Sequence, residues 1–152
     1  MQTAAKTSST DSMQKIAQEL LRAQAVHDID KLQRIYHPEC LIEYPGLGIK
    51  HRGHSSLRAG IALLKSIFRD YEADQKEWAF EKNTLVSWGT VKMTLAGNFN
   101  GHVPNGKRVL LTNFTVLKFT DGLVAYEGQF LDRATICLQS GIPLDALMQT
   151  KM

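Results

Sequence analysis

The hydrophobic residues in the first half of the chain recur at the spacing of an α-helix. They predict helices at about 11–25, 28–36 and 55–68, and Pro38 prevents continuation of the second. Gly60 is unfavourable inside a helix, so we expect it to mark a close contact between the third helix and the sheet. The inward faces comprise Met13, Ile16, Ala17 and Leu20, then Ile29, Leu32 and Ile35, then Leu57, Ile61, Leu64 and Phe68.

From Tyr71 onward the alternation changes to a period of two residues, which is typical of β-strands. A short strand at 40–45 comes earlier, and the segment 46–54 after it is expected to be a loop. Turns are predicted at Lys82-Asn83 and Asp121-Gly122. The long strands are predicted at about 71–82, 84–96, 108–119 and 123–131.

Helices followed by a run of long strands predict an α+β fold. We expect a cone-like α+β barrel, in which three N-terminal helices pack on a strongly curved antiparallel or mixed sheet and enclose an apolar pocket. Residues 1–10 are polar and predict a flexible tail. No repeat or low-complexity linker divides residues 11–152, so they are expected to form one domain.

The composition is typical of a globular protein and excludes several classes. The net charge of +3 is mild and the basic residues are scattered, so nucleic acid is not an expected partner. No apolar run approaches the roughly 20 residues of a membrane span, so no membrane is expected either. Cys40 and Cys137 stand apart without a pairing motif, which is typical of thiols in a reducing cytoplasm, the expected compartment.

The segment GNFNGHVPNGKRVLLTNFTVLKFTDGLV, residues 97–124, resembles a family pattern. It follows G-x-F-x-G-x-x-P-x-G-x-x-V…F-x-D-G-x-(I/V), the pattern of SnoaL-like polyketide cyclases of the nuclear-transport-factor-2-like superfamily. The resemblance covers about residues 12–142 and implies the fold of ketosteroid isomerase. The matching positions are Gly97, Phe99, Gly101, Pro104, Gly106, Val109, Phe119, Asp121, Gly122 and Val124.

The resemblance also implies a catalytic acid for an aldol-type cyclisation. In the cyclases this acid stands eleven residues after the turn aspartate, which here is Asp132. Their usual second member, a histidine, corresponds to Thr115. The functional groups of ketosteroid isomerase are absent, because Tyr44 replaces its base and Leu20 and Thr115 fall at its oxyanion-hole positions.

Strand alternation then suggests which side chains share a pocket with Asp132. Such a pocket is apolar with few polar groups, which suits a small hydrophobic molecule bearing a carbonyl group. Asn113, Thr115 or Tyr126 would donate hydrogen bonds to a developing enolate. No metal and no cofactor is expected. The predicted pocket residues are Asn113, Thr115, Tyr126, Tyr44, Met93, Leu117 and Phe130.

Asp132 also has a second interpretation, because aspartate is among the best helix N-caps and Gly141 would end the helix behind it. Capping hydrogen bonds and the helix dipole lower a carboxyl pKa, whereas a base needs a raised one. Two functions remain open at this point. One is a cofactor-free isomerase- or lyase-type enzyme, and the other is a non-catalytic module that binds a hydrophobic ligand.

The opposite face of the long strands is also rich in apolar residues. Trp88, Phe114 and Val116 would point outward with Leu110 and several threonines. Such a face predicts a homodimer formed sheet to sheet, which members of the superfamily commonly form. The histidines are expected at loops and helix ends, with His51 and His54 in the loop that precedes the third helix.

Overall fold

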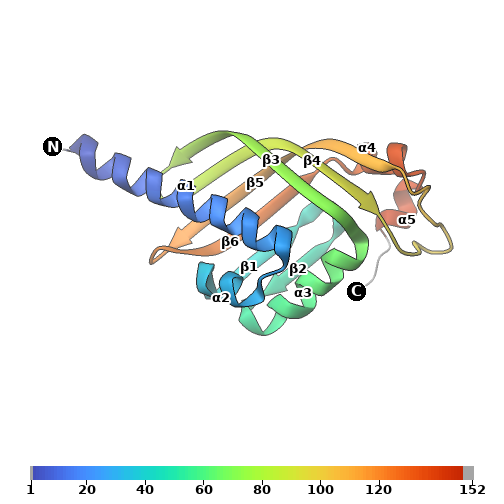
Figure 1. The fold of residues 1–152 in the computed structure, drawn as a ribbon, viewed down its shortest axis with the longest axis horizontal. Helices are drawn as coiled ribbons and strands as arrows, with labels where there is room; N and C mark the ends of the chain where they lie inside the picture. The colour runs from blue at the N-terminus through green and yellow to red at the C-terminus, as the bar shows by residue number, and fades with distance from the viewer. Residues whose placement is uncertain (1, 149–152) are drawn as a thin grey trace.

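The computed structural model of the chain describes residues 2–148, and the side chains of residues 10–147. The described residues form five α-helices and one mixed β-sheet (Figure 1). The helices are α1 (Gln2–Val26), α2 (Ile29–Ile35), α3 (Gly53–Ile67), α4 (Arg133–Ser140) and α5 (Leu144–Met148). The strands are β1 (Tyr36–Tyr44), β2 (Ile49–Arg52), β3 (Phe68–Glu81), β4 (Thr84–Leu95), β5 (Arg108–Thr120) and β6 (Leu123–Leu131), with a 3-10 turn at Pro45–Leu47.

The six strands lie in the order β2-β1-β6-β5-β4-β3. β1 runs parallel to β6, and every other neighbouring pair is antiparallel. The sheet curves strongly without closing, and α1 to α3 lie across its concave side, whereas α4 and α5 lie at one end (Figure 1).

The curvature depends on a bulge in β3 opposite Gly89 of β4. The pairing of the two strands shifts between Gln75 and Glu77, which increases the local twist. A Cβ atom at position 89 would lie 1.9 Å from the backbone oxygen of Asp74. Only glycine allows the two backbones to approach so closely, so this position fixes the bend of the sheet.

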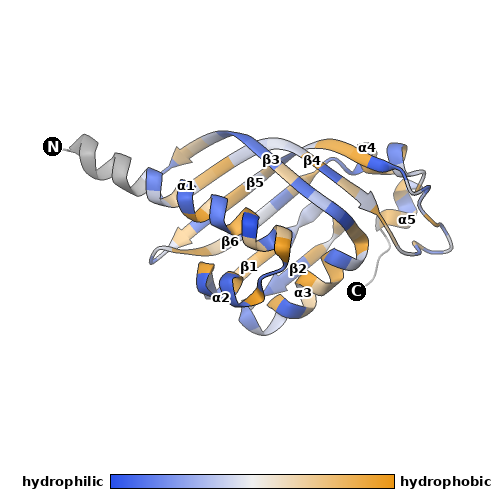
Figure 2. Cartoon of the chain, viewed as in Figure 1, coloured by the Kyte–Doolittle hydropathy of each residue, from blue (hydrophilic) through white to orange (hydrophobic). Residues whose placement is uncertain are grey.

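The two faces of the sheet differ in character. Hydrophobic and polar residues alternate along the strands (Figure 2). The concave face carries the buried core, including Leu85, Val91, Met93, Val109 and Leu117. The convex face keeps Leu110, Phe114 and Phe130 about half exposed, so burial is one-sided.

The predicted α+β fold with a strongly curved mixed sheet is confirmed. Gly60 marks a close contact, because a Cβ atom there would lie 2.7 Å from the ring of His51. The predicted loop at 46–54 is wrong in part, since β2 lies within it and pairs with β1. α1 begins at Gln2, so its bounds include residues expected to form the flexible tail, whose flexibility stays a prediction. Residues 1 and 149–152, the last of them within the expected domain, lie outside the described residues.

Candidate functional site

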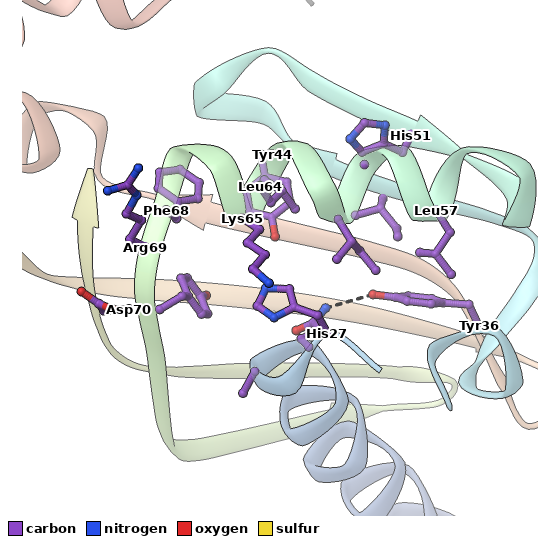
Figure 3. A pocket seen from close by; sticks show the side chains of 16 residues that line it. His27, Tyr36, Tyr44, His51, Leu57, Leu64, Lys65, Phe68, Arg69 and Asp70 are labelled. Carbon is purple, nitrogen blue, oxygen red and sulfur yellow. Dashed lines mark hydrogen bonds between the residues drawn. The ribbon is translucent and has the colours of Figure 1, made fainter. Parts of the chain in front are cut away.

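A cavity of about 450 Å³ opens between the concave face of the sheet and the helices α1 and α3 (Figure 3). Its size suits a small organic molecule. Apolar side chains form most of its wall, which favours an apolar ligand. The lining residues on which the following argument depends are Tyr36, Tyr44, Tyr71, Gln24, His51 and Lys65, with Ile42, Leu57, Ile61, Leu64 and Phe68 as the apolar wall.

Two tyrosines present free hydroxyl groups to this cavity. Among the described residues, the hydroxyls of Tyr44 and Tyr71 have no hydrogen-bond partner. Both residues line the cavity, and their hydroxyl oxygens are accessible from it. Burial raises the pKa of both phenols, and the negative charge of Glu127 adds to the shift. Both side chains therefore remain protonated donors, available to an oxygen acceptor on a ligand.

A buried carboxylate lies beneath the tyrosines. Glu127 of β6 is fully buried, and its oxygens accept hydrogen bonds from the hydroxyl of Tyr36 and from the Nε2 amide of Gln24 at 3.0 and 3.1 Å. The same amide also donates to the hydroxyl of Tyr36 at 3.0 Å, which is the contact drawn in Figure 3. Burial and then the charge of Glu127 raise the pKa of Tyr36 well above its usual value. Tyr36 and Gln24 both line the cavity, so they connect the buried carboxylate to it.

The polar network continues away from the cavity along the concave face. Gln129 donates to Glu127 at 2.7 Å, and its own carbonyl oxygen accepts from Thr115 at 2.9 Å and from Asn113 at 3.0 Å. Asn113 in turn accepts from Gln75 at 2.7 Å. This chain of hydrogen bonds satisfies polar groups that are otherwise expensive to bury.

Comparison with known proteins identifies the family. The model of the SnoaL-like domain family matches residues 17–127, well over half of the chain. The chain belongs to the SnoaL-like family. No curated protein matches it at a significant level.

Solved structures of low sequence identity share this SnoaL-like fold. A proposed SnoaL-like polyketide cyclase from Jannaschia sp. CCS1 is 18% identical, with a TM-score of 0.75 over 88% of this chain and 94% of that one. IdmH from Streptomyces antibioticus, a proposed polyketide cyclase, is 18% identical, with a TM-score of 0.71 over 84% and 97%. AclR from Streptomyces galilaeus, a proposed hydroxylase, is 20% identical, with a TM-score of 0.65 over 84% and 80%. These likenesses establish the fold, and the chemistry has to be argued from the site.

The predicted site residues of this SnoaL-like chain divide between the two faces of the sheet. Tyr44 lines the cavity, and Asn113, Thr115, Met93 and Leu117 are buried on the concave face. None of these last four is part of the cavity wall. Asn113 and Thr115 instead hold Gln129 in place, so their contribution to the cavity is indirect.

Asp132 lies outside the inner cavity, at an exposed position where it lines a second, open hollow with residues of the convex face such as Phe114 and Phe130. Its carboxylate caps α4, accepting from the hydroxyl of Thr135 at 2.6 Å and from its amide at 3.2 Å. Hydrogen bonds from Thr135 lower the pKa of Asp132. The expectation that Asp132 shares a pocket with Asn113 and Thr115 is therefore wrong, and the capping interpretation describes what the carboxylate does here.

Tyr126 and Phe130 also lie on the convex side. The register pairs Phe130 with Phe114 and Tyr126 with Lys118, both outward, whereas Gln129 and Glu127 pair with the inward Thr115 and Leu117. The hydroxyl of Tyr126 donates to Glu43 at 3.2 Å, away from the cavity. The alternation was right in period but assigned to the wrong face over most of β6. A register shift around Ala125 adds to this, since it places Val124 inward as well.

Sequence reasoning missed the polar centre of the site. Glu127 and Gln129 stand two residues apart in a strand, and two polar residues at that spacing were the available indication of a buried network. It also placed His51 in a loop, but His51 lies on β2 and lines the cavity, with a buried Nε2 atom that has no partner. Burial lowers the pKa of His51, which favours the neutral ring.

The described part of the chain contains neither a candidate metal site nor a candidate membrane-spanning helix. Within residues 2–148, no three His, Cys, Asp or Glu side chains come together in a way that could hold a metal ion. No helix described there is long and apolar enough to cross a membrane.

Proposed function

We propose that the inner cavity binds a small, mainly apolar molecule with a carbonyl group and promotes proton transfer next to that carbonyl. The observation that carries the proposal is the pair of free phenol hydroxyls, Tyr44 and Tyr71, in an otherwise apolar wall. A carbonyl oxygen accepts hydrogen bonds and gains negative charge as an enolate forms. Donors fixed in a water-poor cavity stabilise that charge.

Tyr36 and Glu127 are the proposed acid–base pair. The hydroxyl oxygen of Tyr36 would take a proton from the carbon beside the carbonyl while the hydroxyl proton passes to Glu127, to which it is already hydrogen-bonded. The reverse transfer returns a proton to the ligand, and the overall reaction is an isomerisation. No phenolate accumulates on this route, so it is compatible with the raised pKa of Tyr36.

A non-catalytic binding function is the second candidate, and a specific observation favours it. The carboxylate of Glu127 already accepts hydrogen bonds from three side chains, Tyr36, Gln24 and Gln129. Donors to a carboxylate stabilise its charged form and weaken it as a base. In that case the cavity and the free tyrosines would hold a carbonyl-bearing ligand without changing it.

One experiment separates the two functions. Methyl octyl ketone is incubated with the protein in deuterated water, and exchange of the hydrogens next to the carbonyl is followed by NMR alongside calorimetric binding. The proposal expects faster exchange with the wild type and loss of that acceleration in Tyr36→Phe. Tyr44→Phe and Tyr71→Phe each remove only a hydroxyl without a protein partner, so they should weaken binding by about two- to tenfold without unfolding.

Each possible outcome selects or rejects one of the two functions. Saturable binding without accelerated exchange would select the non-catalytic function. No binding of the ketone by the wild type would reject both. Retained binding in the Tyr44→Phe, Tyr71→Phe double variant would show that the free hydroxyls do not contact the carbonyl.

We propose, as a separate matter, that the convex face joins two copies of the chain. Leu110, Phe114 and Phe130 are 50%, 47% and 43% exposed, and the rings of Trp88 and Phe114 stack with their centres 6.2 Å apart. Val116 adds apolar surface beside them. Half-exposed aromatic residues on paired strands favour a self-complementary interface. Light scattering on Phe114→Glu should show a monomer where the wild type is a dimer, and an unchanged dimer mass would overturn this proposal.

A further inference from the structure

The opening of the cavity carries positive charge without a counterion. Lys65, in the last turn of α3, and Arg69, at the start of β3, both line the cavity and are exposed. The three ion pairs among the described residues involve other cations, and neither side chain has a hydrogen bond there. Two unpaired cations thus stand at the edge of an apolar chamber.

A lysine at this place has one ordinary explanation, since a cation in the last turn of a helix is stabilised by the helix dipole. That explanation does not account for where the side chain lies. Lys65 extends from α3 toward the end of α1, and it and His27, just after α1, point toward one another (Figure 3). Burial lowers the pKa of His27, and the charge of Lys65 lowers it further. The two groups share one side of the opening and repel when both are charged.

The nearby carboxylates do not neutralise Lys65. Asp70 is the acid that lines the cavity, and its carboxylate lies apart from Lys65 in Figure 3 and accepts a weak hydrogen bond from Thr94 at 3.4 Å. Glu127 lies beneath the cavity wall and is occupied by its own donors. An anion placed between Lys65 and His27 would therefore meet positive potential and no competing acid.

We propose that the ligand of this cavity is an oxo acid, whose carboxylate binds Lys65 at the opening while its carbonyl group reaches Tyr44 and Tyr71. The apolar body between the two ends would lie against Leu57, Ile61 and Leu64 of α3. The inference rests on the proposed function for the carbonyl end and adds the charge at the other end. It defines the substrate class as amphiphilic and anionic.

Three ligands that differ at one end test the charge. 9-Oxodecanoate carries the carboxylate, methyl 9-oxodecanoate blocks it as an ester, and methyl octyl ketone replaces it by a methyl group. Calorimetry at low ionic strength should show the oxo acid binding about fivefold more tightly than the ester, with the advantage shrinking as salt screens the pair. Lys65→Gln should abolish the advantage of the oxo acid over its ester.

Lys92→Gln is the matched control, because Lys92 is an exposed cation on the convex face. It removes the same charge far from the opening and should preserve the advantage. A second measurement is the pKa of His27 followed by NMR. It should rise in the complex with the oxo acid, because the carboxylate offsets the charge of Lys65, and it should not rise in the complex with the ketone. The charges of Arg69, Asp70 and Glu127 act on His27 in both complexes, so they do not contribute to the difference in its pKa.

The outcomes distinguish this inference from the proposed function. If the ketone binds in a way that depends on Tyr44 while the oxo acid gains nothing over its ester, the inference fails alone. If the advantage survives in Lys65→Gln or disappears equally in Lys92→Gln, the carboxylate does not bind at Lys65 and the inference also fails. If none of the three ligands binds, both proposals are rejected.

Discussion

Two carboxylates on or beside β6 show how differently one strand can use the same chemical group. Glu127 points to the concave side, is fully buried and is held by Tyr36, Gln24 and Gln129. Asp132 follows the end of the strand, is exposed and caps α4 through Thr135. The first acid influences the cavity and the second stabilises a helix end. The role of an acid here depends on the face of the sheet to which its side chain points, more than on its place in a sequence motif.

Removing the bend that creates the concave side should have the largest effect. Gly89→Ala would place a Cβ atom 1.9 Å from the oxygen of Asp74, so one of the two strands has to move. We expect a loss on the order of 4 kcal/mol or more, which leaves little folded protein. Circular dichroism and expression yield would measure it.

Gly48→Ala is the control for the strain of glycine alone. Gly48 has a φ of 68°, but a Cβ atom there would meet nothing within 4 Å. That variant should lose only about 1 kcal/mol. Equal stability of the two variants would show that the close approach at Gly89 does not matter.

Changing the buried acid should have the next largest effect. In Glu127→Gln one carboxylate oxygen becomes an amide nitrogen, which then faces donors from Tyr36 and Gln24 or from Gln129. Buried donors would be left without acceptors, so the free energy of unfolding should fall by about 2–4 kcal/mol in denaturant titration. Glu81→Gln, at the exposed end of β3, should change it by less than about 0.5 kcal/mol. Similar losses in the two variants would contradict a structural role for the network.

The buried tyrosines make the stability of the protein depend on alkaline pH. Three of the four tyrosines line the cavity, and burial with the charge of Glu127 raises their pKa above the ordinary 10.0. A group with a raised folded pKa contributes stability that is fully present below its unfolded pKa and is lost as the pH rises through the folded value. Alkaline titration of phenolate absorbance should show Tyr126 ionising in the folded protein and the other three only on unfolding. If all four tyrosines ionised together before unfolding, the proposed burial of the three cavity tyrosines would be wrong.

The exposed acid should give the smallest effect. Asp132→Ala removes the cap of α4, so the melting temperature should fall slightly, while ketone binding in the inner cavity should not change. Its pKa is lowered from 3.8, so the stability that it contributes is present above about pH 3.8 and is lost as the pH falls through the lowered value. The difference in melting temperature between wild type and variant should therefore vanish in acid. A large loss of ketone binding in Asp132→Ala would restore Asp132 as a site residue.

The comparison also explains which parts of the molecule could be predicted from sequence. Helix and strand periods are local properties, so α3, the long strands and the cap of α4 were within reach. The orientation of β6 was not, because its two alternating sets compete. One set holds Tyr126 and Phe130 and is the more apolar, so the rule of burying apolar residues selects it. The structure buries the set with Glu127 and Gln129 instead.

The reason lies in partners that are remote in the sequence. A buried acid is tolerable only when donors are supplied, and those donors come from α1 and β1, namely Gln24 and Tyr36. No local pattern around Glu127 contains this information. The cavity wall also depends on remote partners. His51 enters it because β2 pairs with β1, and Tyr71 enters it because β3 pairs with β4; no sequence motif indicates either.

The amide of Gln24 has a consequence for how a ligand enters and leaves. Both of its hydrogens are committed to Glu127 and Tyr36, and the same stretch of α1 forms one wall of the cavity. If α1 swings away from the sheet, it takes donors from a buried carboxylate, so that motion has a barrier of its own. Ligands too large for the resting opening would then dissociate at a rate set by α1, and their residence times would converge even where their affinities differ.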